Sequence, residues 1–387
     1  MINTCVYYQL NPVLFGNGTI KYAGEKAREI GISKALVVSD EGVKKAGHVA
    51  ALEEILRSAG IQYVVWSEAQ KDCPDETVKI ASEIARNEKV DGVIGLGGGS
   101  VLDTAKAIAA VSANDDRVLD DIAEYLMGEK EYEHPPLPLM EIATTSGTGS
   151  ESTFVSVVSS SSLNCKMGLP VSPDYGIVDP ELTLTVPRYV TAFTGMDALA
   201  HAVESLTEQK NSPHSDLLAY EAIRLICKYL PEAVKDGNDI EAREYLALAS
   251  NFAGISFNES GTHIGHSCAH ALGHLYHIDH GVCCADLTPG VIQFTAMTFP
   301  EKIKNVGRLF GITFSELDSP KVIGEKTAEA AARFGKAIGI KSLRDHGLPK
   351  EEVLCVAGVV NADHLCHCFA GNVTLDDIRG VLEAGYQ

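Results

Sequence analysis

The stretch GVIGLGGGSVLDTAKAIAA, residues 92–110, carries the pattern that decides the fold. Its first part, Gly92–Gly97, is apolar or small throughout and predicts a buried β-strand. The part from Ser100 to Ala110 predicts a helix, with Ser100 at the N-cap because serine is favoured there. Glycines join the two parts, so the stretch predicts a strand, a tight turn and a helix in succession.

Strand-like and helical segments alternate on both sides of this stretch. Apolar or β-branched runs predict strands at residues 35–39, 63–66 and 139–143. Residues 75–87 have helical spacing, with Val78 and Ile80 among the side chains placed to form an apolar face. This strand–helix–strand order predicts an α/β domain with a parallel, doubly wound sheet.

The second half of the chain has few strand signals after Val178–Pro180. Helical periodicity instead runs through residues 191–206, 215–229, 241–256 and 327–338. We therefore predict an α/β domain over residues 1–186 and an all-helical domain over residues 187–387.

The overall charge is strongly acidic. The 387 residues include 52 Asp and Glu against 32 Lys and Arg, a formal net charge of −20. This balance argues against a nucleic acid or an anionic membrane as the main partner, although local basic groups can still bind a small anion. The chain has no apolar run long enough for a membrane span and no secretory pattern at its start. Its ten cysteines do not suit a disulfide framework, so we predict a cytoplasmic protein with reduced thiols.

The glycine turn at Gly97–Gly98–Gly99–Ser100 predicts a phosphate-binding site. Glycines let a backbone approach a pyrophosphate closely, and the N-terminus of the following helix presents unpaired N–H groups to its charge. A simple tight turn is the alternative, since glycines serve that role as well. A second polar turn, TTSGTGSE at residues 144–151, suits a ribose or phosphate at the carboxyl edge of the sheet, and an ordinary loop is equally compatible.

The histidines are strongly clustered. Six of the 13 lie in one short window: His263, His266, His270, His274, His277 and His280. Asp197 and His201 stand four residues apart in a predicted helix, so both point from one face. A carboxylate with several imidazoles is a ligand set for a first-row transition metal, although a single histidine is more often a surface or core residue. Spacing alone does not select the ligands, and the spare histidines would serve proton transfer, substrate contact or structure.

Together these motifs resemble the iron-containing (group III) alcohol dehydrogenase family. The matching stretches, in the family's order, are GGGSVLDTAKAIA (97–109), TTSGTGSE (144–151), VDPELT (178–183), TGMDALAHAVES (194–205) and HSCAHALGHLYHIDHG (266–281). The resemblance implies a Rossmann-like N-terminal domain and an all-helical C-terminal domain, a dehydroquinate synthase-like architecture with the cofactor in the cleft. We also expect a homodimer or a higher homo-oligomer.

The resemblance assigns roles to residues of both domains. It implies a divalent metal, usually iron with zinc as an alternative, on Asp197, His201, His266 and His280. It makes His270 a catalytic proton relay or a neighbour of the nicotinamide rather than a ligand. The residues implied for the pyrophosphate are Gly97, Gly98, Gly99 and Ser100. Those implied for the nicotinamide half of the cofactor are Asp103, Thr144, Thr145 and Thr148, with Lys106 on the same helix as Asp103.

Asp40 is the residue from which we predict the identity of the cofactor. An ordinary dinucleotide fingerprint has its ribose-binding acid about 20 residues after the glycines. In the family that this chain resembles, the acid follows an earlier strand, here in Val38–Ser39–Asp40. A carboxylate there accepts hydrogen bonds from a ribose 2′-hydroxyl and repels a 2′-phosphate, so we predict NAD(H) rather than NADP(H).

The implied reaction interconverts a short-chain primary alcohol and its aldehyde, with the metal as Lewis acid and NAD(H) as hydride carrier. The chain departs from the family pattern where the substrate would bind. Glu259 replaces a usual asparagine, His263 replaces a usual glycine, and the region around His367 lacks a usual Asn-Pro-Arg. The predicted substrate contacts are Phe257, Glu259, His263 and His367. We infer a substrate with a polar or anionic group, such as a carboxylated or sulfonated aldehyde.

The same residues allow other functions. A glycerol-dehydrogenase-like polyol oxidoreductase would use similar domains with fewer metal ligands. A metallohydrolase with a coincidental glycine turn, or a metal- or cofactor-binding scaffold without catalysis, would contain parts of the pattern. The native metal and the physiological direction stay open, as do the roles of His274, His277 and the cluster Cys366–His367–Cys368. The cysteines near the metal segment are predicted as packing residues: Cys268, Cys283 and Cys284.

Overall fold

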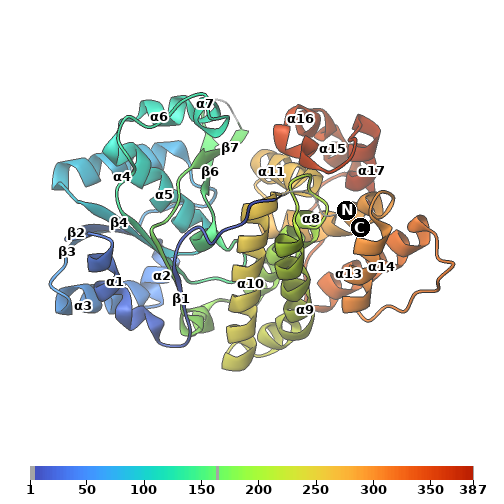
Figure 1. Cartoon of the computed structure of the whole chain (residues 1–387), viewed down its shortest axis with the longest axis horizontal. Helices are drawn as coiled ribbons and strands as arrows, with labels where there is room; N and C mark the ends of the chain where they lie inside the picture. The colour runs from blue at the N-terminus through green and yellow to red at the C-terminus, as the bar shows by residue number, and fades with distance from the viewer. Residues whose placement is uncertain (1–4, 163–164, 387) are drawn as a thin grey trace. The chain divides into compact units, whose positions relative to one another are not determined.

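Residues 5–162 and 165–386 are described by the computed structural model, and they form two compact units (Figure 1). The α/β unit comprises Gln9–Thr145 and Gly149–Val186. The helical unit runs from Pro187 onward and also includes the loop Ser146–Thr148 and the segment that ends at Tyr8. The predicted domains were residues 1–186 and 187–387, and the two units differ from them in that both short segments belong to the helical unit.

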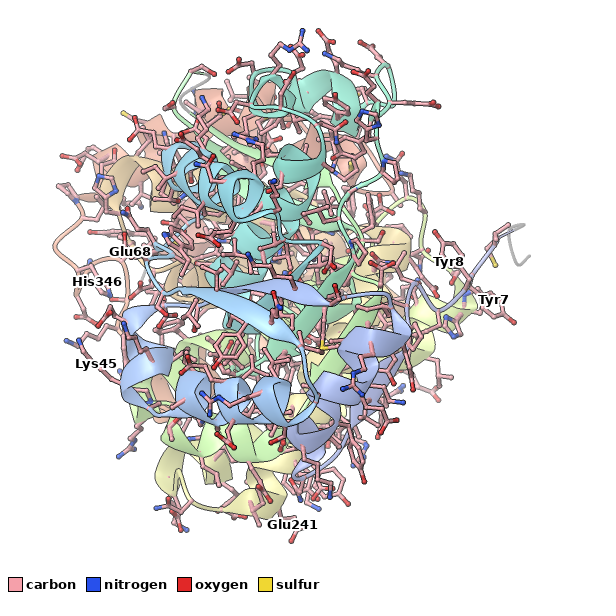
Figure 2. The ribbon with its side chains drawn as sticks, turned by 90° about the vertical axis from the view of Figure 1, so that its left-hand side faces the viewer. Tyr7, Tyr8, Lys45, Glu68, Glu241 and His346 are labelled. Atoms are coloured by element: carbon pink, nitrogen blue, oxygen red, sulfur yellow. The ribbon has the colours of Figure 1, made fainter. Side chains whose placement is uncertain are left out.

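Local contacts explain why the two short segments belong with the helical unit. Gly147 lies so close to Thr194 that a Cβ atom on it would come within 2.8 Å of the Thr194 side chain. The backbone of Gly147 also hydrogen-bonds to His201. The ring of Tyr7 stacks on that of His214 with the centroids 4.5 Å apart, and Tyr7 is otherwise exposed (Figure 2).

The centre of the α/β unit is a six-stranded parallel sheet in the order β1-β8-β5-β4-β2-β3. Its strands are β1 (Val13–Phe15), β2 (Lys34–Val38), β3 (Gln62–Trp66), β4 (Gly92–Gly97), β5 (Leu139–Ala143) and β8 (Tyr175–Val178). A separate antiparallel pair consists of β6 (Val155–Ser160) and β7 (Cys165–Pro170). The predicted strands and the predicted parallel, doubly wound fold are confirmed.

Helices cover both faces of the six-stranded sheet (Figure 1). On one face lie α1 (Ala23–Glu29), α2 (Glu41–Lys45) and α3 (His48–Ser58); on the other lie α4 (Asp75–Glu88), α5 (Gly99–Ala113), α6 (Arg117–Asp120) and α7 (Ile122–Leu126). The connections contain the 3₁₀-helices η1 (Thr19–Tyr22), η2 (Ser150–Ser152) and η3 (Pro180–Thr185). Successive strand residues alternate between the two cores, so that Val93 packs in one and Ile94 in the other. This burial holds β5, β4 and β2 side by side, with their carboxyl ends at one edge.

The turn between β4 and α5 differs from the prediction at one residue. α5 begins at Gly99 with Gly98 as its N-cap, so the predicted cap at Ser100 is wrong. The Ser100 hydroxyl instead accepts a hydrogen bond from the backbone N–H of Asp72 at 3.1 Å. Glycine is required by close packing here, because a Cβ atom on Gly97 would lie 2.5 Å from the Val101 side chain.

The described part of the helical unit contains no strand of either sheet. Its helices are α8 (Arg188–Ser205), α9 (Pro213–Lys235), α10 (Ile240–Ser260), α11 (Ile264–Tyr276), α12 (His280–Ala296), α13 (Pro300–Leu309), α14 (Pro320–Ala337), α15 (Lys350–Cys355), α16 (Ala357–Ala362), η4 (His364–Cys368) and α17 (Leu375–Gly385). The predicted all-helical character is confirmed. No described helix combines the length and the apolar character that a membrane span needs.

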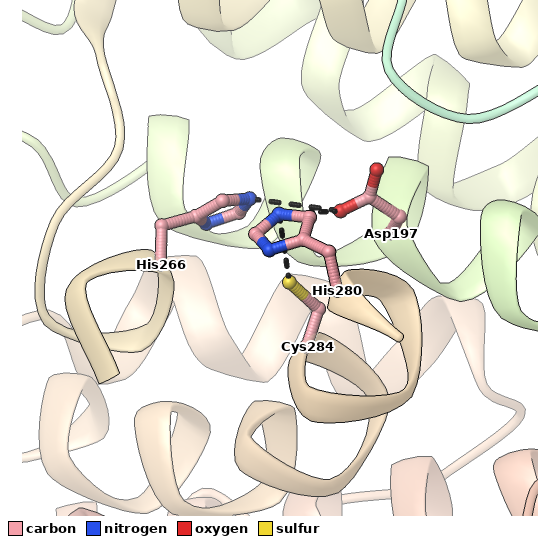
Figure 3. Close-up of side chains that lie close together, drawn as sticks. All are labelled: Asp197, His266, His280 and Cys284. Carbon is pink, nitrogen blue, oxygen red and sulfur yellow. Dashed lines mark hydrogen bonds and ion pairs between the residues drawn. The ribbon is translucent and has the colours of Figure 1, made fainter. Parts of the chain in front are cut away.

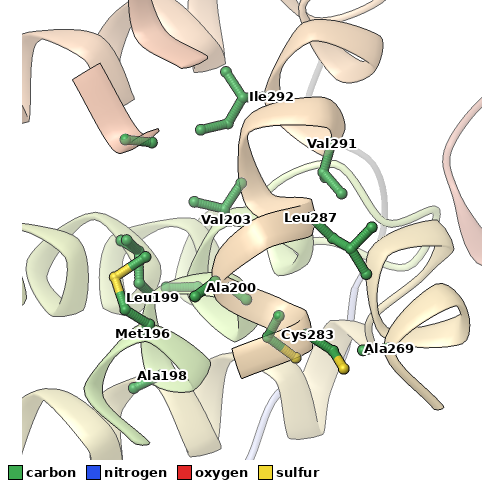
Figure 4. Packing of buried hydrophobic residues seen from close by; sticks show 14 of the residues in the cluster. Met196, Ala198, Leu199, Ala200, Val203, Ala269, Cys283, Leu287, Val291 and Ile292 are labelled. Atoms are coloured by element: carbon green, nitrogen blue, oxygen red, sulfur yellow. The ribbon is translucent and has the colours of Figure 1, made fainter. Parts of the chain in front are cut away.

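Helix α12 lies at the centre of the helical unit's core. It packs against α8, α11, α14 and α17 and is buried along most of its length. Leu287 and Val291 of α12 belong to the same apolar cluster as Met196 and Val203 of α8 (Figure 4). At the start of α12, a Cβ atom on Gly281 would lie 2.4 Å from a backbone oxygen of α8. The first turn of α12 therefore lies directly against α8, and polar side chains of the two helices meet there.

Candidate metal centre and cofactor turn

Three helices bring four potential metal ligands together in the helical unit (Figure 3). Asp197 lies on α8, His266 on α11, and His280 and Cys284 on α12. One donor atom from each of these residues lies within 4.8 Å of the others, and we call this group the donor cluster. His280 and Cys284 share a face of α12 because they stand four residues apart. The packing around α12 thus assembles a donor set that no single helix provides.

The spacing of the donor atoms suits a divalent cation. Asp197 Oδ1 lies 3.4 Å from His280 Nε2 and 3.8 Å from His266 Nε2. Ligands that are each about 2.0–2.3 Å from one tetrahedral metal ion are separated by roughly 3.3–3.6 Å. The side chains of Asp197 and His266 are buried, and that of His280 is partly exposed. The two carboxylate–imidazole separations therefore lie close to those that a bound metal requires.

His201 lies beside the donor cluster rather than in it. Its ring stacks on the ring of His266, with the centroids 4.3 Å apart, and on the ring of Phe257 at 4.2 Å. Burial lowers the pKa of His201 well below its ordinary value, and charge on His266 adds to the effect. A neutral imidazole is the form that binds metals. The four ligands predicted from the sequence are thus brought into one region, with Cys284 as an additional donor.

Glu204 on α8 is a buried carboxylate that sequence reasoning did not single out. It accepts hydrogen bonds of 2.6 Å from His266 Nδ1 and from the backbone N–H of His263. Burial alone would raise the pKa of Glu204, but His266 and His263 lower it to about 2. A carboxylate on Nδ1 directs Nε2 of His266 toward the donor cluster, as is usual for metal-binding histidines. The available signal was spacing, because Asp197, His201 and Glu204 share one helix face.

Two buried nitrogen atoms show whether a metal fits these residues. His266 Nε2 and His201 Nδ1 have no hydrogen-bond partner among the described residues, although buried polar atoms are normally bonded. Burial would lower the pKa of His266, but the carboxylate of Glu204 raises it above its ordinary value. The region therefore combines buried negative charge with unbonded imidazole nitrogens, which suits a first-row divalent metal such as Fe²⁺ or Zn²⁺.

The other histidines of the window have different surroundings. His270 is half-buried, and its ring centroid lies 5.2 Å from that of His280. His263 is fully buried, with Nε2 bonded to the Thr207 hydroxyl at 2.9 Å and Nδ1 3.4 Å from Glu204. A ring enclosed in this way is not accessible to a substrate. The structure therefore argues against the substrate contact predicted for His263 and gives it a structural role.

The remaining predicted substrate residues contact three different partners. Phe257 stacks on His201, next to the donor cluster. The carboxylate of Glu259 bonds to His214 Nδ1 at 2.6 Å. His367 is exposed and bonds through Nε2 to the carbonyl of Asn361 at 2.9 Å. Of these three, Phe257 is the one that touches a predicted metal ligand.

The predicted cofactor residues of the α/β unit gather at the carboxyl ends of β2, β4 and β5. Asp40 follows β2, and its Oδ1 accepts a hydrogen bond from the Val43 N–H at 2.8 Å, which caps α2. The glycine turn Gly97–Ser100 follows β4. Thr144 follows β5, and its N–H bonds to the Gly97 carbonyl at 2.9 Å. The adjacent Thr145 packs against the turn at Gly98.

Asp103, Lys106 and Thr148 have other surroundings. Asp103 accepts hydrogen bonds from the Ser150 hydroxyl at 2.9 Å and from the Val157 N–H at 3.1 Å. Desolvation raises the pKa of Asp103, and Lys106 partly offsets this. Lys106 is fully buried and donates to the Ser150 hydroxyl at 2.8 Å. These contacts hold the segment after β5 in place, whereas Thr148 lies in the loop that belongs to the helical unit.

Two sequence profiles match most of the chain. One, described as iron-containing alcohol dehydrogenase, matches residues 11–180. The other, described as the C-terminal part of the Fe-containing alcohol dehydrogenase family, matches residues 191–386.

Characterised and solved proteins of similar length also match. The chain is 34% identical over 374 residues to the NAD-dependent methanol dehydrogenase of Bacillus methanolicus, which covers 96% of this chain and 97% of that protein. A crystal structure of 1,3-propanediol oxidoreductase matches 100% of both chains with a TM-score of 0.90 and 32% identity. Sulfoacetaldehyde reductase from Bifidobacterium kashiwanohense, solved in complex with NAD⁺, matches 98% of both chains with a TM-score of 0.86 and 28% identity.

Proposed function

Because the chain belongs to the iron-containing alcohol dehydrogenase family, we propose that it is an NAD(H)-dependent oxidoreductase that interconverts a short-chain primary alcohol and its aldehyde at a divalent-metal site. The observation that carries this proposal is the donor cluster with His201 beside it. The names of the relatives, a methanol dehydrogenase and a 1,3-propanediol oxidoreductase among them, support the reaction class. We propose Fe²⁺ as the metal, with Zn²⁺ as the alternative, since both accept these donors.

The chain's own residues would hold the reactants and move one proton. When bound, the metal would supply Lewis acidity to the carbonyl oxygen and the nicotinamide would supply the hydride. We assign the ion to Asp197, His201, His266 and His280. Glu204 would fix the ring of His266 through its 2.6 Å hydrogen bond. His270, whose ring stacks on that of His280, would relay the proton between the alcohol oxygen and solvent.

We propose NAD(H) rather than NADP(H) because of Asp40. The Val43 N–H holds its carboxylate at the end of β2, and β2 pairs with β4, which carries the glycine turn. A ribose 2′-hydroxyl can donate to this carboxylate, whereas a 2′-phosphate would be repelled. The turn Gly97–Ser100 would approach the pyrophosphate. The residues proposed for the nicotinamide half are Asp103, Thr144, Thr145 and Thr148.

Replacing Asp40 by Asn tests this assignment. Asn is still a good N-cap for α2 but removes the charge, so we expect the preference for NADH over NADPH to fall at least about fivefold. The measurement is kcat/KM for each cofactor with the same aldehyde. Glu41→Gln removes a neighbouring exposed acid and serves as the control. An unchanged preference in Asp40→Asn contradicts the assignment.

The finer part of the proposal is a polar or anionic group on the substrate. The likeness to sulfoacetaldehyde reductase supports it. The burial of His263 counts against one of the two basic residues expected to bind such a group, and His367 is the other. We expect faster turnover of carboxylated or sulfonated short aldehydes than of plain C2–C4 aldehydes, and the reverse order contradicts this part alone.

The deciding experiment is an anaerobic NADH-oxidation assay of the full-length protein reconstituted with Fe²⁺. The panel contains plain, hydroxylated, carboxylated and sulfonated short aldehydes, and glycerol with NAD⁺ tests for a polyol oxidoreductase. We expect His280→Ala to lose activity while circular dichroism shows an unchanged fold. Full activity in His280→Ala would contradict the metal assignment. We extend the proposal to a cytoplasmic homodimer or higher homo-oligomer, which light scattering and cell fractionation test.

A further inference from the structure

We propose that the thiol of Cys284 is a metal ligand in this protein. This inference rests on the proposed metal site and adds to it a donor outside the carboxylate-and-imidazole set. Cys284 is 2% exposed, and its Sγ lies 3.5 Å from His280 Nε2 (Figure 3). The same sulfur lies within 4.8 Å of every other donor atom of the cluster. Its predicted role as a packing residue is therefore incomplete.

The fold holds this thiol on the metal side of α12. Cys284 stands one turn after His280, so both side chains point from the same face. The adjacent Cys283 is fully buried in the apolar core and is not part of the donor cluster (Figure 4). The two neighbours share residue type and burial but differ in access to the donors. Cys283 is therefore a matched control for Cys284.

The separations within the donor cluster suit one carboxylate, two imidazoles and one thiolate around a single ion, and His201 beside the cluster would be a fifth ligand. With metal–nitrogen distances of about 2.0–2.1 Å and a metal–sulfur distance of about 2.3 Å, tetrahedral ligand pairs lie roughly 3.3–3.6 Å apart. The observed separations from His280 Nε2 are 3.4 Å to Asp197 Oδ1 and 3.5 Å to Cys284 Sγ. His266 Nε2 is buried, lies 3.8 Å from the same carboxylate oxygen and has no hydrogen-bond partner within residues 5–162 and 165–386. An unbonded nitrogen in that position is an independent sign of a cation site.

A thiolate ligand changes which metal the site prefers. Thiolates are soft donors that favour Zn²⁺ and similar ions, whereas carboxylates and imidazoles alone serve Fe²⁺ as well. We infer that Cys284 shifts the preference of this chain from Fe²⁺ toward Zn²⁺. Replacing one outer hydrogen-bond partner of a metal ligand typically weakens metal binding 10–100-fold, so loss of a direct ligand should cost at least about tenfold.

Cobalt substitution of the full-length protein tests the proposal directly. The apoprotein is loaded anaerobically with Co²⁺, whose visible bands report binding and whose near-ultraviolet charge-transfer band reports a thiolate ligand. We expect that band in the wild type and in Cys283→Ser, and its loss in Cys284→Ser. Chelator competition should show Zn²⁺ affinity reduced at least about tenfold in Cys284→Ser. After loading from a solution with equal Zn²⁺ and Fe²⁺ concentrations, mass spectrometry should show a lower ratio of bound zinc to bound iron in Cys284→Ser than in the wild type.

Each outcome bears on a different part of the proposal. Bound cobalt without the charge-transfer band in the wild type, or with the band retained in Cys284→Ser, rules out the thiol ligand and leaves the proposed function standing. Failure of the wild type to bind cobalt at all contradicts the metal site and the proposed function together. Circular dichroism checks that the variants fold, and Cys284→Ala provides a second variant with no oxygen that could replace the sulfur.

Discussion

Glu204 is the residue through which the protein orients the ring of His266. Its carboxylate is buried, and its hydrogen bond to His266 Nδ1 is 2.6 Å long. We expect Glu204→Gln to weaken metal binding about 10–100-fold, because the neutral amide holds the ring less firmly and lowers the basicity of Nε2. Competition with a metallochromic chelator measures the affinity. Glu241→Gln on the surface of α10 is the control, and equal affinities in the two variants would show that Glu204 has no such role.

A second buried acid, Glu208, makes stability depend on pH. Desolvation raises the pKa of Glu208 from the ordinary glutamate value to about 7, although the Lys210 N–H partly opposes this. The folded protein therefore keeps a proton on Glu208 that the unfolded chain releases. The contribution of Glu208 to stability is fully present below about pH 4.5 and is lost as the pH rises to about 7. We expect Glu208→Gln to remove this fall and to be more stable at pH 8 by on the order of 1 kcal/mol.

Urea unfolding between pH 4 and pH 8 measures this difference. Glu316→Gln, which removes an exposed acid from a loop, should leave the pH dependence unchanged. Parallel curves for the wild type and Glu208→Gln across this range would show that the buried carboxyl does not titrate there.

At the scale of single residues, the sequence predicted the metal-binding types but not their neighbours. The spacing of Asp197 and His201, and the family motif around His266 and His280, identified residues that the fold brings together. Whether a side chain faces the metal or the core depends on how three helices pack, and local spacing carries no information on that. For this reason the sequence did not show that the ring of His263 is buried.

The helix α12 tolerates very little change where it meets α17. A Cβ atom on Gly290 would lie 2.4 Å from the carbonyl oxygen of Val381, and backbone atoms cannot move aside as a side chain can. We expect Gly290→Ala to destabilise the protein by about 1–3 kcal/mol, measured by denaturant unfolding. Gly380→Ala on α17 is the matched control, because a Cβ atom there meets nothing within 4 Å.

Gly290→Ala should lower the free energy of unfolding, whereas Gly380→Ala should raise it. An exposed helical glycine replaced by alanine gains up to about 1 kcal/mol from helix propensity. If Gly290→Ala were as stable as Gly380→Ala, close packing between α12 and α17 would not limit the residue at this position.

At the scale of elements, periodicity found the helices but not all of their details. The helix predicted at 75–87 is α4, yet Ile80, placed on its apolar face, is 54% exposed. A helical face at the edge of a core is buried only where a neighbour covers it, and that neighbour is distant in sequence. The N-cap of α5 is Gly98 rather than the predicted Ser100. Serine is the better N-cap by residue type alone, so local preference favoured the wrong residue.

Metal removal belongs to the scale of the whole molecule, because the donor cluster joins α8, α11 and α12. A ligand present at 100 times its Kd stabilises the folded state by about 2.7 kcal/mol. Because the unfolding entropy grows with chain length, we expect chelation to lower the unfolding temperature by roughly 3 °C. Hydrogen exchange should rise in α11 and the first turn of α12 and stay unchanged in β2, β4 and β5. If α11 and α12 exchanged at the same rate in the metal-free and the metal-loaded protein, the metal would not link these helices.

The overall architecture was predictable because alternating strands and helices are a local pattern. The parallel order follows from that alternation, and the helical second half follows from its periodicity. The assignment of Ser146–Thr148 to the helical unit was not predictable, since it depends on the approach of Gly147 to Thr194 far along the chain.

This loop limits how the protein can be divided. The chain passes from one unit to the other after Tyr8, Thr145, Thr148 and Val186. A fragment beginning at Pro187 would lack Gly147, whose backbone bonds to His201. The helical half is therefore not a self-sufficient module for exchange with a relative. During synthesis it is completed only by segments that were translated well before it.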